Sequence, residues 1–210
     1  MKKIFSTVLA SVMMLAGTSA FAQISVGAGY INSTLSGKSS SPTISNGFYA
    51  GASFDMPLPM KGLTFTPGAY LSLITGGTQG TLSVFGLNLL SGKTTFSELA
   101  LNVPAMLNYG YKLSGKSKVF AYAGPTFQLG LLSRTAGEAS GIFSNSGVRD
   151  HYSSGDFNRF NVYLGGGLGL EYSRIQFIIG YDYGLLNLYT GSGDSVINRA
   201  NLHIGLGFAL

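Results

Sequence analysis

Alternation of apolar residues with small or polar ones recurs eight times along the chain, and no other feature constrains the fold as strongly. In one segment, Ile175, Phe177 and Ile179 alternate with Gln176 and Gly180. Successive side chains of a β-strand point to opposite faces, so each segment predicts a strand with one apolar face. The eight predicted strands are 23–34, 46–56, 62–74, 96–110, 117–133, 159–172, 174–186 and 199–210.

The composition indicates where such strands could be stable. Charged residues make up only 10% of the chain, against about 25% in a typical soluble globular protein. Beyond the N-terminal segment, no window approaches the roughly 18 consecutive apolar residues of a membrane-spanning helix. A closed barrel in lipid can accommodate this composition, because closure pairs every backbone N–H and C=O group. We therefore predict an all-β fold, an eight-stranded antiparallel up-and-down transmembrane β-barrel.

A soluble barrel of the lipocalin kind is the alternative. Its solvent-facing side would be rich in Lys and Glu, whereas here the second face of each strand carries Gly, Ser, Thr, Asn and Tyr. These residues suit a narrow interior, in which glycines leave room for bulky inward side chains. The bulky inward residues are Tyr49, Tyr70, Phe120, Tyr122 and Tyr163. The membrane barrel is therefore favoured.

The connections between the predicted strands alternate in length. The short ones are 57–61, 111–116 and Ser173, and the long ones are 35–45, 75–95, 134–158 and 187–198. Outer-membrane barrels have short periplasmic turns and longer extracellular loops. We expect the four long loops outside the cell and the N-terminal end of the barrel in the periplasm.

The N-terminus resembles an export signal. Two lysines are followed by a charge-free, largely apolar stretch, 4–17, and by an Ala-x-Ala pattern that ends at Ala22. The stretch is shorter than the roughly 20 residues of a membrane anchor. We expect residues 1–22 to be a cleaved signal peptide and 23–210 to be the barrel domain, located in the outer membrane of a Gram-negative bacterium.

Charge and cysteine content restrict the possible partners. Without the two N-terminal lysines, 11 Lys and Arg stand against 8 Asp and Glu (13 − 2 = 11), a small and scattered excess. This pattern does not indicate nucleic-acid binding. The chain contains no cysteine, which excludes disulfides and thiolate metal sites. We expect no cofactor.

Four segments are similar to a known family. They are Leu99–Tyr109 (LALNVPAMLNY), Val119–Thr126 (VFAYAGPT), Phe160–Tyr172 (FNVYLGGGLGLEY) and Tyr181–Asn187 (YDYGLLN). In order and spacing they resemble the bacterial outer-membrane protein β-barrel domain family, the porin-like group that includes PorT. The resemblance implies an outer-membrane barrel and carries no catalytic residues. Such barrels usually end in Phe. Leu210 keeps the outward parity here, so we expect assembly by the barrel-insertion machinery.

A few polar residues have inward parity and form a predicted interior polar network. They are Asp55, Glu98, Asn102, Glu171, Asp182 and His203. Buried charges are costly unless paired, and Asp182 and His203 lie on the last two strands, so we predict a hydrogen-bonded pair. A hydrolytic site would need a nucleophile such as Ser72 or Thr126, and the spacing places neither beside His203. We predict a structural network and no enzymatic activity.

The long loops are the predicted contact surface, because binding groups concentrate in loops on a rigid scaffold. The candidate residues are Leu82, Val84, Phe85, Leu87, Arg149, His151 and Tyr152. The alternative for 75–95 is that the hairpin extends above the membrane and its apolar groups pack on each other. A cation site of His151 with Asp150 and Asp156 is disfavoured, since one imidazole in a polar loop is usually solvated.

Three arginines, Arg134, Arg159 and Arg199, are expected near the outer rim, either solvated or bound to lipopolysaccharide phosphates.

Three functions stay open. The favoured one is a plugged barrel with a structural or interaction role through its extracellular loops, which could contact an extracellular or envelope protein. The alternatives are a narrow porin-like channel for small solutes and an outer-membrane lipid-modifying hydrolase.

Overall fold

The computed structural model describes residues 23–37, 40–84, 87–141, 145–152, 157–189 and 196–210, and the expected signal peptide lies outside these ranges. Every regular element in the described part is a β-strand. The strands are β1 (Gln23–Gly37), β2 (Ser40–Pro57), β3 (Leu63–Val84), β4 (Leu87–Ser114), β5 (Ser117–Gly141), β6 (Asn145–Asp150), β7 (Phe160–Tyr172), β8 (Ile175–Gly184) and β9 (Ile197–Ala209). The described residues contain no helix long and apolar enough to cross a membrane.

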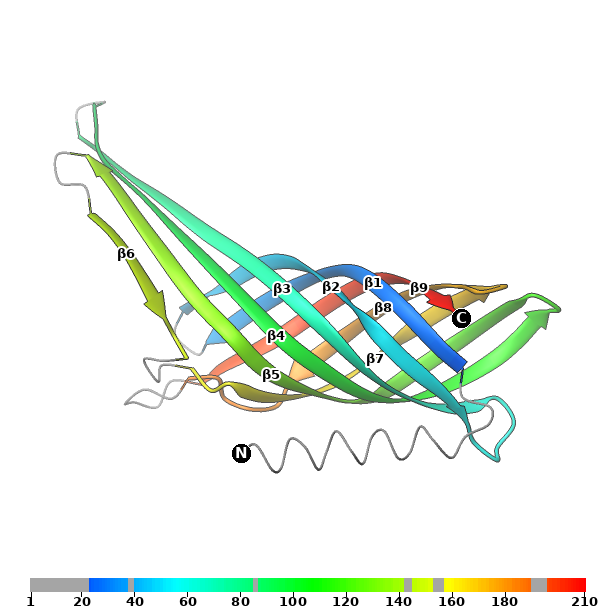
Figure 1. The fold of residues 1–210 in the computed structure, drawn as a ribbon. Coiled ribbons are helices and arrows are strands. Elements are labelled where there is room, and N and C mark those ends of the chain that lie inside the picture. Colours follow the sequence, from blue (N-terminus) through cyan, green and yellow to red (C-terminus); the bar gives the residue numbers. More distant parts are fainter. Residues whose placement is uncertain (1–22, 38–39, 85–86, 142–144, 153–156, 190–195) are drawn as a thin grey trace.

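Eight of these strands form a closed antiparallel ring (Figure 1). Its order is β1–β2–β3–β4–β5–β7–β8–β9, and β9 pairs back to β1 from Ser25↔Ala209 to Gly37↔Ile197. β6 pairs with β5 and lies outside the ring. The predicted eight-stranded antiparallel barrel is confirmed.

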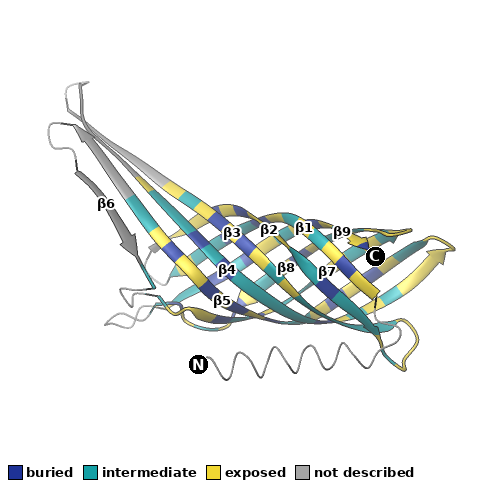
Figure 2. Ribbon diagram, viewed as in Figure 1, coloured by how far each residue is buried: buried dark blue, intermediate teal, exposed yellow. Residues whose placement is uncertain are grey.

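The two faces of the barrel wall differ as the alternation predicts. Along β8, Phe177 and Ile179 are exposed, whereas Gly180 is buried in the wall. The same alternation crosses the other strands as bands (Figure 2). Leu168 and Leu206 on the outer wall are each more than 60% exposed. So much exposed apolar surface suits a lipid environment and would be a liability in water.

A β-bulge in β5 interrupts the alternation. Leu99 pairs with Leu132 and Ala100 with Gly130, so Leu131 has no residue directly opposite on β4. Leu131 and Leu132 are both exposed, and Ser133 is buried again. The extra residue reverses which face of the sheet the side chains of β5 point to from Leu132 onward, as a bulge does.

Three short turns lie at one end of the barrel, here named the short-turn end. They are 58–62 between β2 and β3, Gly115–Lys116 between β4 and β5, and Ser173–Arg174 between β7 and β8. Ser173 has a φ of 60°, as a two-residue hairpin turn can require. The expected turn 111–116 is shorter than predicted, because Tyr111 and Leu113 continue the outward alternation of β4.

At the opposite end, the prediction that 35–45, 75–95 and 134–158 are loops is wrong for most of their length. The alternative for 75–95, a hairpin that extends beyond the barrel, is confirmed by its strand pairing. β3 and β4 pair as far as Val84↔Leu87, β5 continues to Gly141, and β6 pairs with it. The Thr, Val and Phe residues of these segments favour strands, and hairpin pairing satisfies their backbone hydrogen bonds. The result is the projecting sheet (76–84, 87–96, 134–141 and 145–150), which extends beyond the ring in Figure 1.

Candidate functional site: the barrel interior and the projecting sheet

An ion pair crosses the interior in the half of the barrel nearer the projecting sheet. Arg199 Nη1 lies 2.5 Å from Glu98 Oε1, and Arg199 Nη2 lies 2.7 Å from Glu98 Oε2. Four steps separate β4 from β9 in either direction around the ring, so the pair connects opposite walls. Both side chains are 5% exposed or less. Arg199 is thus no rim cation, and that expectation is corrected.

A chain of neutral hydrogen bonds lies next to this pair. The Tyr163 hydroxyl donates to Gln128 Oε1 at 2.9 Å, and Gln128 Nε2 donates to Asn102 Oδ1 at 2.9 Å. Asn102 Nδ2 in turn donates to Ser72 Oγ at 2.8 Å. The chain joins β7, β5, β4 and β3 and fills the interior with side chains, as an eight-stranded barrel allows.

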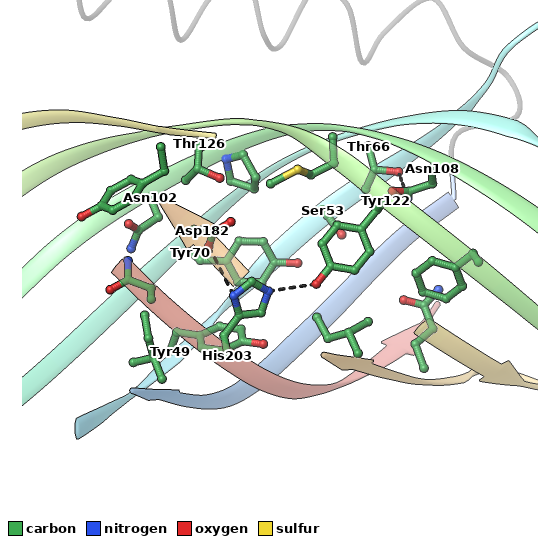
Figure 3. A pocket seen from close by; sticks show the side chains of 18 of the residues that line it. Tyr49, Ser53, Thr66, Tyr70, Asn102, Asn108, Tyr122, Thr126, Asp182 and His203 are labelled. Atoms are coloured by element: carbon green, nitrogen blue, oxygen red, sulfur yellow. Dashed lines mark hydrogen bonds and ion pairs between the residues drawn. The ribbon is translucent and has the colours of Figure 1, made fainter. Parts of the chain in front are cut away.

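His203 occupies the middle of the interior, between two partners (Figure 3). Its Nδ1 lies 3.3 Å from Asp182 Oδ2, and its Nε2 lies 2.9 Å from the Tyr122 hydroxyl. Gly180 makes room for this arrangement, since a Cβ there would lie 2.2 Å from the Tyr122 hydroxyl oxygen. Tyr49 also packs edge-on against the imidazole, with 6.1 Å between ring centroids.

Two further polar clusters lie inside the short-turn end. The Thr66 hydroxyl donates to Asp55 Oδ1 at 2.7 Å and accepts from Asn108 Nδ2 at 2.7 Å. Glu171 Oε2 lies 3.6 Å from Lys118 Nζ and accepts from Gln176 Nε2 at 3.2 Å. Each interior carboxylate named here therefore has a cationic or hydrogen-bonding partner.

All six residues of the predicted network lie inside the barrel, but they fall into separate clusters. Asp182 and His203 are brought together, whereas Asp55, Glu98, Asn102 and Glu171 each join a different group. The sequence interpretation missed two interior cations, Lys118 and Arg199. The parity of Lys118 matches that of Phe120 and Tyr122, and the parity of Arg199 matches that of Asn201 and His203, so the alternation itself contained the signal.

A cavity of about 170 Å³ remains around His203. Its lining includes Asp55, Ser72, Thr126 and Asp182. Ser72 Oγ accepts a hydrogen bond from Asn102, and the Nε2 of His203 is hydrogen-bonded to the Tyr122 hydroxyl. The imidazole therefore activates neither the Ser72 nor the Thr126 hydroxyl in this arrangement. No group of three His, Asp or Glu residues suited to a metal ion occurs among the described residues.

The predicted contact residues belong mostly to the projecting sheet. Leu82 and Val84 lie on β3, Leu87 lies on β4, and Arg149 lies on β6. The side chains of these four residues are outside the described part of the structure, and Phe85 is outside the described residues altogether. The loop residues next to the sheet are packed. His151 Nε2 lies 2.6 Å from the Thr135 hydroxyl, and its ring lies 5.1 Å from that of Phe157. The Arg159 guanidinium lies over the Tyr152 ring at 5.2 Å.

Comparison with known proteins gives a match to one protein family and to several solved barrels of low sequence identity. A model of the outer membrane protein β-barrel domain matches residues 16–190. No curated protein matches the chain in sequence. One similar solved structure is that of Ail of Yersinia pestis in complex with the heparin analogue sucrose octasulfate. It is 14% identical to this chain, the match covers 90% of this chain and 99% of that chain, and the TM-score is 0.44. Neisserial surface protein A is 12% identical, with 88% and 96% covered and a TM-score of 0.48.

Proposed function

The chain belongs to the outer-membrane β-barrel domain family, and from this premise we propose that it anchors an extracellular interaction surface, the projecting sheet, in the membrane. The barrel itself resides in the outer membrane of a Gram-negative bacterium. Residues 1–22 serve as the export signal. The protein acts by binding and not by catalysis, a proposal supported by the partners of His203, since Asp182 and the Tyr122 hydroxyl occupy its two ring nitrogens.

The observation that carries the proposal is the open edge of the projecting sheet. Pairing of β3 with β2 ends at Asn46↔Thr75, and in the described part of the chain β3 continues to Val84 with β4 as its only strand partner. Natural sheets usually protect such an edge with Lys or Pro. Residues 76–84 contain neither and no other charge. An edge of this kind can accept an added strand from a partner polypeptide.

Cross-linking in living cells tests this role. A photo-reactive amino acid at Thr78 or Thr81, on the free edge, should form covalent adducts with a protein partner, detectable as a shifted band and identifiable by mass spectrometry. The same amino acid at Leu168, on the lipid-facing wall, should give no protein adduct. Adducts at Leu168 but none at either edge position would refute the proposal.

A hairpin deletion separates this role from anchoring. Removal of residues 79–93 with a two-residue turn in their place shortens β3 and β4 beyond the Thr78↔Thr94 pair and leaves the ring pairings intact. The variant should still run as a heat-modifiable folded barrel, and a photo-reactive amino acid at Thr78, which the deletion retains, should no longer give the cross-linked partner.

The channel alternative predicts conductance, and the interior geometry opposes it. The Glu98–Arg199 pair and the Tyr163–Gln128–Asn102 hydrogen bonds occupy successive levels of a narrow barrel. The purified protein in a planar bilayer should therefore show no stable single-channel steps. Reproducible open levels from the folded protein, absent from a heat-denatured control, would favour the channel over the plugged barrel.

Lipid and assembly partners follow from the outer wall. Arg134, at the base of the projecting sheet, and Arg159, beside it, are both exposed, and lipopolysaccharide phosphates would provide their counter-charges. Leu210 is exposed on the outer wall at the short-turn end, and its backbone N–H donates to Ile24. This placement supports a role for the last strand in recognition by the barrel-insertion machinery.

A further inference from the structure

Exposed cations gather at the short-turn end of the barrel. Lys61 lies in the turn between β2 and β3, Lys112 and Lys116 lie in the β4–β5 hairpin, and Arg174 lies in the turn between β7 and β8. All four are exposed. Together they are named the basic rim. Backbone hydrogen bonds tie the turns that carry it to their neighbours, with Ser173 N donating to Lys116 O at 2.7 Å and Gly110 N donating to Gly62 O at 2.8 Å.

The basic rim has no acidic counterpart among the described side chains. The acidic residues whose side chains are described, Asp55, Glu98, Glu171 and Asp182, are buried or half-buried inside the barrel. At the short-turn end, Glu171 already pairs with Lys118, and Asp55 accepts from Thr66. No ion pair to any of the four rim cations occurs within the described part of the chain.

The register adds a local excess of positive charge. Lys112 on β4 lies directly opposite Lys118 on β5, and like charges opposite each other on a sheet repel. Glu171 forms an ion pair with Lys118 and not with Lys112. An external anion near Lys112 would relieve the remaining repulsion.

The surroundings of the basic rim are apolar and aromatic. Large outward side chains flank the four cations, each more than half exposed: Met60, Tyr109, Tyr111, Leu113, Tyr172 and Ile175. Lys112 lies between Tyr111 and Leu113 in the sequence and, by the alternation of the strand, on the opposite face of β4 from them. Arg174 lies between Tyr172 and Ile175, with Ser173 of the turn intervening. Aromatic and aliphatic side chains next to cations are typical of the boundary between acyl chains and lipid headgroups.

We propose that the basic rim binds the headgroups of anionic phospholipids in the leaflet that faces the periplasm. The aromatic and aliphatic residues hold the wall at the acyl-chain boundary, and the four cations contact the phosphates immediately beyond it. A lysine or arginine near an anionic membrane surface strengthens binding by roughly fivefold. The site is distinct from the projecting sheet, which lies at the opposite end of the barrel.

Fluorescence quenching by brominated lipids can measure this preference locally. The chain has no Trp, so Tyr111→Trp supplies a single reporter beside the basic rim and Leu168→Trp supplies a matched reporter in the middle of the wall. In vesicles that mix brominated phosphatidylglycerol with phosphatidylcholine, the Tyr111→Trp protein should prefer phosphatidylglycerol by about fivefold or more. The Leu168→Trp protein should show a preference near one. Because each reporter senses only nearby lipid, the orientation of insertion does not affect the result.

Charge removal completes the test. Replacing Lys61, Lys112, Lys116 and Arg174 together by Gln should reduce the Tyr111→Trp preference to about one, and salt at about 0.5 M should weaken the preference in the parent protein. Replacing Arg134 and Arg159 by Gln, at the other end, should leave it unchanged. A preference that survives the fourfold replacement in a protein folded by gel shift and circular dichroism would overturn the proposal, as would equal preferences at both reporters.

Discussion

Replacing Arg199 by Met should lower the free energy of unfolding by about 3–5 kcal/mol, the cost of removing one partner of a buried ion pair. The variant leaves Glu98, a residue that is only 3% exposed, without its bidentate partner. Because the pair joins opposite walls, its loss also removes a contact across the ring. The measurement is a urea titration of the protein in lipid vesicles, followed by circular dichroism and by the heat-modifiable gel shift.

Two companion variants separate loss of the pair from loss of packing. Glu98→Leu combined with Arg199→Met removes both charges, and we expect it to recover most of the lost stability, since apolar replacement of a buried pair is often neutral or better. Arg199→Lys keeps the charge but not the bidentate geometry, and it should lie between the parent and Arg199→Met. Equal stability of Arg199→Met and the parent would mean that Glu98 has another partner or is protonated.

The alternation in the sequence predicts the wall of the barrel well, because a period of two decides which side chains face lipid. It also places His203 and Asp182 on one face of neighbouring strands, where the structure has them 3.3 Å apart. Contacts across the interior depend in addition on the stagger of the strands around the ring. Side-chain parity contains no information on stagger. For this reason Glu98 could be assigned to the interior from the sequence, but its pairing with Arg199 could not.

The projecting sheet shows a different limit. Segments 75–84 and 87–95 are rich in Thr, Ser, Gly and Leu and do not alternate as the barrel strands do, because lipid imposes no apolar face on them. Pairing of β3 with β4 nevertheless continues, since a hairpin satisfies its own backbone hydrogen bonds wherever its residues tolerate an extended conformation. The bulge at Leu131 likewise depends on the fit between β4 and β5 and leaves no mark in the composition.

Gly29→Ala should destabilise the barrel by about 1–3 kcal/mol, the usual cost of inserting a group where there is no room. A Cβ at Gly29 would lie 2.2 Å from the carbonyl oxygen of Ile204 and 2.7 Å from Cα of Gly205, both backbone atoms of β9. No side-chain rotation can relieve these contacts, so the β1–β9 seam that closes the ring must shift. We expect a lower urea midpoint and slower appearance of the heat-resistant folded band.

Gly27→Ala is the matched control, on the same strand and the same inward face. A Cβ there would lie 3.2 Å from Leu206 O and 3.7 Å from Cα of Gly207, contacts that a shift of a few tenths of an ångström relieves. Both replacements remove the same flexibility from the unfolded chain, so the difference between them isolates the close approach. Gly27→Ala should stay within about 1 kcal/mol of the parent. If the two variants are equally stable, the seam at Gly29 is wider than its backbone contacts indicate, and the glycine there is not required for closure.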